Sequence, residues 1–584
     1  MKITKITRLA AMAAAVFALS ACHNELDNQP DGKVNTAEQI TFKVNFEDYN
    51  TDEEVQGTRA LAPDTLAKQV IDLDNNLLAE VSIQRDTTKA DRATTRALSN
   101  GTYTMLAYQG STLKGEVTGT VNNGEFYVTG NPMVLAPGTY DFVLYSDLTR
   151  SGNTFIVDRS NMSNAQIGRT TGVVITSQLE TQEVVFNLKH LGARMKIKLT
   201  GYMPYPAMAA TLSSVNATSV PNQVVYDAVA DSWTGYTNAA LSENCTFPAN
   251  SVWVEGNTGG ASYTFKDINY PSLTNDYFYF LPTTDASKLK LTFHSGKIYR
   301  VDFGNHNVSL TLAPNPAVVM KNNGSYIINV KLRPNYLYLM SDGSTDFVNA
   351  TQYTHLKKSD GTPLYRDKLG NVLTTPKVPV GLVVSQSKRL AMALKPIGKF
   401  ASYMGGASYC NYKTYPKSDS WLTEADVAAI AQDMDGYRYT WEASGSADGT
   451  TIKANQPTLY PAFYQAAHYR DKLISSGVTL TGPMATKNWY LPSGGEWDLV
   501  RLNLGYSDGT KMPSFTVTYK WASYAYYLAL LDVGGVPSGI TFLSSSTEIS
   551  GSRYYSPLTG DGNMGMGSEW WYTVDLTVIP FVKY

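Results

Sequence analysis

The sequence predicts a mainly β protein, with two β-sandwich domains followed by an α+β domain. Short segments in which apolar and polar residues alternate recur up to about residue 332, separated by turn signals such as Asn100-Gly101 and Pro137-Gly138. Helical spacing with capping signals appears only after about residue 335. The chain has 584 residues, which exceeds what one hydrophobic core accommodates.

The composition excludes one class of partner. The formal net charge is -2, so the chain lacks the basic surface that nucleic-acid binding requires. Charged residues make up 17% of the chain, whereas Tyr (39) and Gly (45) are abundant, as in β-sheets with many turns. After the first 22 residues no apolar run approaches the length of about 18 residues that spans a bilayer.

The first residues have the pattern of an export signal. Lys2, Lys5 and Arg8 precede a short apolar segment. Leu19-Ser20-Ala21-Cys22 then matches the lipobox of bacterial lipoproteins. We expect residues 1–21 to be removed, Cys22 to carry a lipid anchor, and the polar residues 23–38 to form a tether. The alternative is an ordinary secretory signal with an incidental cysteine.

Residues 41–46 form the first predicted strand. Phe42, Val44 and Phe46 alternate with polar residues, which predicts one buried face. An acidic loop follows and ends in Thr58-Arg59-Ala60. A strand between a membrane anchor and a basic cleavage point can be removed. Its loss leaves an open sheet edge, which is a template for a strand from another molecule.

Further strands follow in chain order. Residues 184–188 and 195–199 flank Gly192, which predicts a bend or bulge in one long strand that crosses between sheets. The other predicted strands lie within 70–84, 102–107, 126–128, 139–145, 252–254, 277–281, 289–293 and 326–332.

The order of several short motifs resembles the fimbrillin family of Bacteroides-type pilus subunits, over about residues 22–333. The resemblance implies two tandem transthyretin-like β-sandwiches, delivery to the cell surface as an outer-membrane lipoprotein, and trimming by an arginine-specific protease. It also implies assembly with other fimbrial subunits through strand insertion. The motifs are Cys22, the 41–46 strand, Thr58-Arg59-Ala60, Asn100-Gly101-Thr102-Tyr103, Pro137-Gly138-Thr139-Tyr140, Phe186-Asn187-Leu188-Lys189-His190, Phe280-Leu281-Pro282 and Gly324-Ser325-Tyr326.

Carried over to this chain, the resemblance makes Arg59-Ala60 the bond that is cut. Arg96-Ala97 is the competing bond, because it also follows a threonine and precedes an alanine. We favour Arg59, since a cut there releases only the strand before it, whereas a cut after Arg96 also removes the strands at 70–84. A third alternative is that both arginines are ordinary loop residues.

Helical signals distinguish the third domain. Thr423 and Ser493 each begin a capping box, and Pro461 opens a further helix. Residues 489–497, 544–548 and 578–581 resemble C-type-lectin-like domains of bacterial surface proteins, over about residues 375–584. The expected domains are a signal peptide (1–21), a lipidated tether with the removable strand (22–59), two sandwiches (60–200 and 201–334) and a lectin-like α+β domain (335–584).

The third domain departs from the pattern of its relatives. It has no Glu-Pro-Asn triplet for calcium-dependent sugar binding, and Asp433-Met434-Asp435-Gly436 reads as a structural turn. Formylglycine-generating enzymes on this fold use a reactive cysteine pair, but only Cys410 lies here, and Cys245 lies in another domain. We therefore expect no metal, no cofactor and no enzymatic activity. Trp489 to Trp497 is expected to be scaffold, as are most residues of three aromatic groups around 403–415, 519–527 and 570–572.

These features favour a fimbrial tip adhesin. A subunit in the shaft donates a C-terminal strand to its neighbour, whereas here a folded domain occupies that place and is expected to bind a glycan or protein ligand. One alternative is an outer-membrane lipoprotein that binds glycans without polymerising. Another is the basal anchor subunit, which keeps its lipid.

Overall fold

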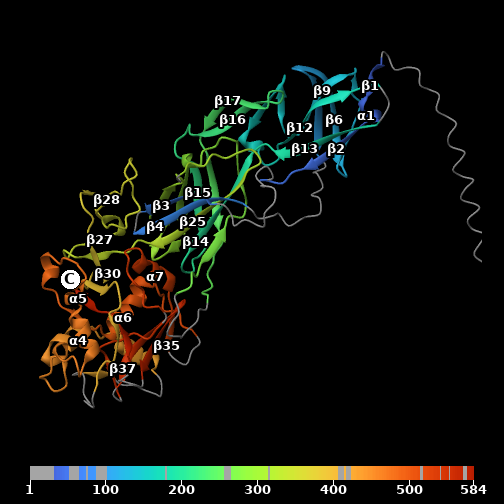
Figure 1. Cartoon of the computed structure of the whole chain (residues 1–584). Helices are drawn as coiled ribbons and strands as arrows, with labels where there is room; N and C mark the ends of the chain where they lie inside the picture. Colours follow the sequence, from blue (N-terminus) through green and yellow to red (C-terminus); the bar gives the residue numbers. More distant parts are fainter. Residues whose placement is uncertain are drawn as a thin grey trace, which may run out of the picture.

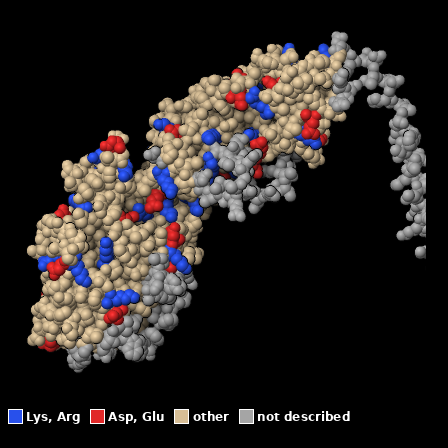
Figure 2. Space-filling model, in the orientation of Figure 1, with Lys and Arg blue, Asp and Glu red and all other residues tan. Residues whose placement is uncertain are grey.

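The computed structural model describes residues 32–50, 65–73, 76–86, 101–177, 181–254, 265–313, 316–404, 413–415, 422–512, 517–539, 541–550, 553–569 and 575–584. These residues form a mainly β protein, in which three units follow one another along an elongated molecule (Figure 1). The first unit lies at one end and the C-terminal unit at the other. Figure 2 shows both signs of charge scattered over a largely uncharged face, in keeping with the low charged fraction.

A closed β-barrel forms the centre of the first unit. We expected two facing sheets, but hydrogen bonds join the strands in the order β12-β13-β2-β7-β6-β5-β9, and β9 pairs with β12. The long strand β12 makes closure possible because it pairs with both β9 and β13, and it carries a bulge between Thr170 and Val173 that bends it. The strands are β2 (Ile40–Phe46), β5 (Thr102–Gln109), β6 (Thr112–Asn122), β7 (Glu125–Val128), β9 (Gly138–Ser146), β12 (Gln166–Ile175) and β13 (Gln182–His190).

A four-stranded sheet covers the outside of this barrel. Alternate residues of β5 and β9 point into the barrel core, and the residues between them, such as Leu106 and Val143, pack with Phe155 and Tyr226 of the sheet. Both faces of β5 and β9 are therefore buried. The sheet contains β10 (Thr149–Ser151), β11 (Thr154–Asp158), β16 (Val220–Asp227) and β17 (Ser232–Ala239).

The second unit is a sandwich whose strands come from three parts of the chain. The hairpin β3–β4 and the strand β14 pair with β25, although the sequence placed all three in the first sandwich. Residues 252–254 are not a strand, and Val252 is exposed. One sheet contains β3 (Thr65–Leu73), β4 (Leu77–Arg85), β14 (Ala193–Gly201), β19 (Tyr270–Leu273), β20 (Phe278–Phe280) and β25 (Ser325–Pro334), and the other contains β15 (Met208–Ser214), β18 (Ser242–Phe247), β21 (Leu289–Ser295) and β24 (Val308–Thr311).

Gly192 marks the point where the chain leaves the barrel for the second unit. It lies in the bend between β13 and β14, as the sequence predicted. A Cβ atom at this position would lie 2.8 Å from Cβ of Met162 and 2.9 Å from the carbonyl oxygen of Phe280. Because real Cβ atoms do not approach other atoms so closely, the bend requires glycine.

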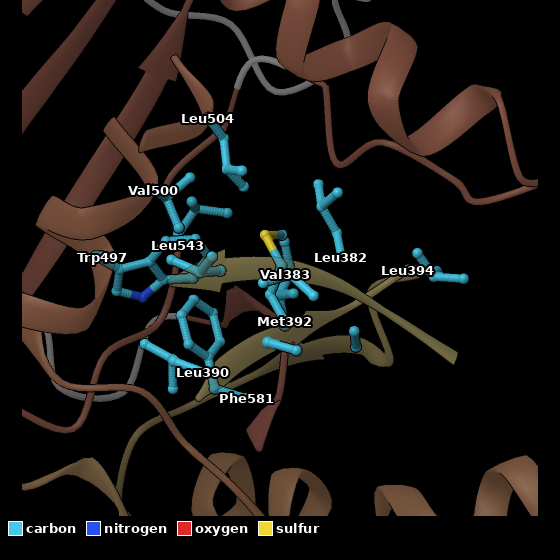
Figure 3. Close-up of a cluster of buried hydrophobic side chains, with 14 of the residues drawn as sticks. Leu382, Val383, Leu390, Met392, Leu394, Trp497, Val500, Leu504, Leu543 and Phe581 are labelled. Carbon is cyan, nitrogen blue, oxygen red and sulfur yellow. The ribbon is translucent and has the colours of Figure 1, made fainter. Parts of the chain in front are cut away.

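The third unit combines helices with several sheets. Its main sheet has the order β27-β26-β30-β31-β40-β34, and its core joins residues far apart in sequence, such as Leu382, Trp497 and Phe581 (Figure 3). The rings of Trp497 and Phe581 meet edge to face at 5.0 Å. The sheet contains β26 (Tyr338–Met340), β27 (Thr345–Asp346), β30 (Pro379–Ser385), β31 (Leu390–Ala393), β34 (Trp489–Tyr490) and β40 (Phe581–Lys583). The helices are α2 (Glu424–Ile430), α3 (Gly436–Trp441), α4 (Pro461–Ala467), α5 (Tyr469–Ser475), α6 (Gly494–Leu499) and α7 (Ser523–Leu531).

A buried arginine connects the second and third units. Nε of Arg333 lies 2.7 Å from Oε1 of Glu80 in β4, and its guanidinium also pairs with Asp532 beside α7. Burial alone would lower the pKa of Arg333, but the Asp532 and Glu80 carboxylates raise it above its ordinary value. Phe265 packs edge to face on Trp521 at 6.0 Å across the same interface. Opposite charges and aromatic packing therefore fix the third unit on the second.

The predicted capping box of α6 is present and fully buried. The Glu496 carboxylate accepts hydrogen bonds from the backbone N–H of Ser493 (2.9 Å) and from the Tyr490 hydroxyl (2.7 Å). Burial raises the pKa of Glu496 from 4.5 to about 7, although these hydrogen bonds act in the opposite direction. The folded chain therefore holds a proton at Glu496 more tightly than the unfolded chain does.

We expect the third unit to lose stability as the pH rises from 4.5 to 7. Between these values the folded state binds a proton at Glu496 that the unfolded state has released, so the free energy of unfolding falls by about 3 kcal/mol at most. Urea unfolding at a series of pH values, followed by tryptophan fluorescence, measures this fall. It should be absent in Glu496→Gln and retained in Glu442→Gln, which changes an exposed carboxylate. An equal fall in both variants would contradict the assignment.

Candidate functional site

The strand β2 lies in the barrel between two strands that are far from it in the sequence. It pairs in parallel with β13 along its whole length, from Ile40 opposite Gln182 to Phe46 opposite Leu188. On its other side it meets β7 antiparallel, at Lys43 opposite Glu125, and the backbone N–H of Val44 donates to the carbonyl of Gly124 (2.7 Å). β2 therefore closes a gap between two strands that lie much later in the chain.

The inner face of β2 is part of the barrel core. Ile40, Phe42 and Val44 are buried and Phe46 is partly buried against the same core, in agreement with the alternation predicted for 41–46. The Phe42 ring lies 5.6 Å from Phe142, 6.2 Å from Phe186 and 6.5 Å from Phe126 between ring centroids. These three phenylalanines line an aromatic site that Phe42 fills.

The outer face of β2 makes only exposed polar contacts. Nζ of Lys43 lies 3.4 Å from Oε1 of Glu125 and 3.9 Å from Oε2 of Glu183, and these charged side chains are between 32% and 56% exposed. Hydrogen bonds from Tyr127 and Lys43 lower the pKa of Glu125. Because exposed ion pairs contribute about 0–1 kcal/mol, the inner face dominates the stability of the strand in its groove.

The groove that β2 fills lies between β13 and β7, and a tight turn borders it on the β7 side. Asn123 and Gly124 both have positive φ, 51° and 77°, and they connect Asn122 to its register partner Glu125. Two successive positive φ values define the turn that best fits the twist of a two-residue hairpin, and an Asn-Gly pair adopts it most readily. The carbonyl of Gly124 is thereby presented to Val44.

The packed segment begins earlier than the sequence indicated. We expected a tether up to residue 38, but β1 (Val34–Asn35) pairs with β8 (Val134–Leu135), and Val34 and Thr36 are buried. The side chain of Asn35 caps the short helix α1 (Thr36–Gln39) by accepting from the N–H of Ala37 (3.2 Å). The pattern of a capping residue followed by Glu38 three places later was the available signal for this turn.

The predicted processing residues lie outside the described residues. These are Cys22, Arg59, Ala60, Arg96 and Ala97. The described chain next resumes after β2 in β3 of the second unit, and after β4 in β5 of the barrel. Arg59 therefore belongs to the connection from β2 to β3, and Arg96 to the connection from β4 to β5.

Among the described residues of the three aromatic groups, Tyr519, Tyr524 and Tyr527 are partly buried against the core of the third unit and the others are buried. Tyr403, Tyr415, Trp521 and Tyr526 are buried, and Asp433 accepts a hydrogen bond from Thr547 within the fold. Tyr409, Tyr412, Trp570, Trp571, Tyr572 and Cys410 lie outside the described residues. Cys245 is buried, and burial raises the pKa of its thiol to about 12. Within the described ranges no group of His, Cys, Asp and Glu is arranged to hold a metal, and no helix is long and apolar enough to cross a membrane.

No family model and no curated protein matches this sequence. A solved fimbrial protein from Bacteroides ovatus is similar at 13% identity and a TM-score of 0.24, covering 94% of this chain and 100% of that one. A fimbrial protein from Bacteroides vulgatus has 12% identity and a TM-score of 0.26, covering 50% and 98%. A Bacteroides uniformis structure provisionally described as a cell adhesion protein has 14% identity and a TM-score of 0.27, covering 40% and 91%. Matches at these scores do not establish the function of this chain, for which the position of β2 is the informative feature.

Proposed function

We propose that this chain is a cell-surface fimbrial subunit that acts as a tip adhesin and accepts a strand from a neighbouring subunit. One observation carries the proposal: β2 completes the barrel core, yet only its two ends connect it covalently to the rest of the fold. If an arginine-specific protease cuts the connection after β2, the strand is held by non-covalent contacts alone. A strand of the same apolar pattern can then replace it.

The free energy favours replacement of β2 by a strand from a neighbouring subunit over a groove that stays empty. Burial of a large apolar side chain contributes about 1.5–3 kcal/mol, so an empty groove forfeits several kcal/mol at Ile40, Phe42 and Val44. It also exposes the hydrogen-bonding edges of β13 and β7, and such edges pair readily with other chains. The neighbour's strand restores both contributions. Removal of the leader, which is the segment up to Arg59 that contains β2, therefore supplies the driving force for assembly.

The position of the β3–β4 hairpin supports Arg59 over Arg96 as the processing site. The hairpin pairs with β25 from Tyr326 opposite Arg85 to Pro334 opposite Leu77, and it supplies Leu77, Val81 and Ile83 to the second core. A cut after Arg96 would separate this hairpin from the rest of the chain. A cut after Arg59 separates only the segment that contains β2.

The pairing of β40 keeps this strand within the third unit. β40 lies between β31 and β34 in the main sheet of the third unit, and Phe581 and Val582 are fully buried. A strand inside a sheet cannot be donated without unfolding that sheet. We propose that the third unit carries the surface that binds a glycan or protein ligand, and that the chain has no catalytic activity.

A second candidate is a surface lipoprotein that keeps its leader, either as a basal anchor or as a glycan-binding protein that does not polymerise. The packing of Val34 and Thr36 favours it, because these contacts strengthen the hold of the leader on the barrel. N-terminal sequencing of the protein from the cell surface separates the candidates. The tip subunit begins at Ala60, whereas the alternative retains Cys22 and its lipid.

Arg59→Ala should block maturation, because an arginine-specific protease then finds no basic residue before Ala60. We expect the variant to reach the outer membrane with its lipid and to be absent from isolated fimbriae. Immunoblotting of both fractions measures this. Arg96→Ala is the matched control and should be processed normally. Normal processing of Arg59→Ala together with a block in Arg96→Ala would move the site to Arg96.

Phe42→Ala should destabilise the barrel by about 3–5 kcal/mol, because it empties the site between Phe126, Phe142 and Phe186. Urea unfolding followed by hydrogen exchange in β5 and β9 measures this loss. Tyr127→Ala, an aromatic residue on the outer face of β7 that is 49% exposed, should cost less than about 1 kcal/mol. Equal losses in the two variants would show that β2 does not stabilise the barrel through its inner face.

A further inference from the structure

The chain immediately after β2 continues to the junction between the barrel and the second unit. The Tyr49 ring stacks on His190 at the end of β13, with centroids 4.1 Å apart and planes 7° apart. The guanidinium of Arg194 in β14 lies 4.0 Å from the centroid of Tyr49 and 4.0 Å from that of Tyr277. A guanidinium is attracted to aromatic faces at this distance. Tyr49 therefore contacts residues on both sides of the bend at Gly192.

Asn50 bonds to the second unit through most of its polar atoms. Its Nδ2 donates to the carbonyls of Asp86 and Ser325, both at 3.1 Å, and its Oδ1 accepts from the N–H of Ser325 at 2.9 Å. Its backbone N–H donates to the carbonyl of Asn323 at 2.8 Å. Asn50 has a φ of +66°, in the left-handed region that asparagine tolerates better than most residues. The side chain thus bridges the end of β4 and the start of β25.

Asn323 connects the same segment to the barrel. Its Nδ2 donates to the carbonyl of Asp48 (3.0 Å), and its Oδ1 accepts from the N–H of His190 (3.3 Å). Its backbone N–H donates to the carbonyl of Gly192 (2.9 Å). The peptide from Asp48 to Asn50 is therefore bound by residues at the ends of β13 and β4, in β14 and around the start of β25.

We propose that the strand-accepting site does not end at Phe46 but extends over this junction, so that a donated strand must carry an aromatic residue and an asparagine shortly beyond its groove-filling part. The proposal rests on the strand-exchange function and specifies the partner. It is a segment equivalent to residues 40–50 from another subunit. Alternating apolar residues fill the groove, an aromatic ring lies three places after the last of them, and an asparagine follows it.

The junction contacts give such a segment two effects that a shorter strand lacks. They add aromatic, cation–π and hydrogen-bond contacts, each typically favourable, to the binding of the strand. They also cross from the barrel to the second unit, so an occupied site holds the two units together. A strand that ends at the position of Phe46 fills the groove and leaves Arg194, Asn323 and Ser325 without these partners.

Hydrogen exchange on the uncleaved, lipid-free chain tests whether the junction belongs to the site. We expect the amides of β2 to exchange at least about tenfold faster in Tyr49→Ala and in Asn50→Ala than in the unmodified chain, because β2 opens more readily when its end is released. Tyr236→Ala and Asn305→Ala, matched changes at exposed positions outside the barrel, should leave these rates unchanged within about twofold. Unchanged β2 exchange in both junction variants would overturn the proposal.

Labelled peptides test the partner directly. A specific protease site placed within 55–61 allows the folded chain to be cut, and peptides with the sequences 40–46 and 40–50 are then offered to it. We expect the longer peptide to dissociate at least about tenfold more slowly, and its Tyr49→Ala version to lose most of that advantage. Equal dissociation of all three peptides overturns the proposal. If the cut chain accepts none of them, strand exchange itself fails, and the hydrogen-exchange result still decides whether the junction holds β2.

Discussion

The parallel pairing of β2 with β13 is the constraint on which the rest of the first unit depends. Parallel neighbours cannot be joined by a tight turn and need a long connection. Here the chain passes from β2 into the second unit and returns to the barrel at β5. It reaches β13 only after it has passed through all the other barrel strands. β5 and β6, by contrast, are joined by a hairpin and cannot part without breaking it. Among the barrel strands, β2 comes first in the chain, yet it lies between β13 and β7 and contributes its inner face to the barrel core.

A buried arginine and aromatic packing hold the second and third units together. Arg333 is neutralised from both sides by Glu80 and Asp532, and a buried charge that lost either partner would be costly. Phe265 extends from the second unit into the core of the third. The barrel is joined to the second unit by the chain after β2, before β5 and at Gly192, and Leu281 packs in the cluster on the outside of the barrel.

Local patterns in the sequence predicted the elements well, and the pairing between distant elements poorly. The alternation at Phe42 and Val44, the bend at Gly192 and the capping boxes at Thr423 and Ser493 all depend on a few neighbouring residues, and each is present. The assignment of the β3–β4 hairpin to the first sandwich was wrong. Its apolar pattern predicts strands in a buried sheet but does not indicate which sheet they join. Val252 was read as part of a strand from its neighbours alone, yet only Trp253 of that segment is buried. No repeating pattern in the sequence marks Tyr49 and Asn50, so their contacts could not be predicted before the fold was known.

The arrangement of β14 and β25 determines how the molecule responds to tension. At Gly192 the chain passes from the barrel into β14, and at the end of β25 it leaves the second unit for the third. These two strands are parallel neighbours from Arg194 opposite Ser325 to Thr200 opposite Lys331. A pull applied to the two ends of the molecule therefore drags the strands past each other along their length. All the hydrogen bonds between them are loaded together in shear, instead of opening one after another as in a peeled hairpin. The pairing of β14 with β25 therefore resists a pull between the first and third units more strongly than a peeled hairpin would.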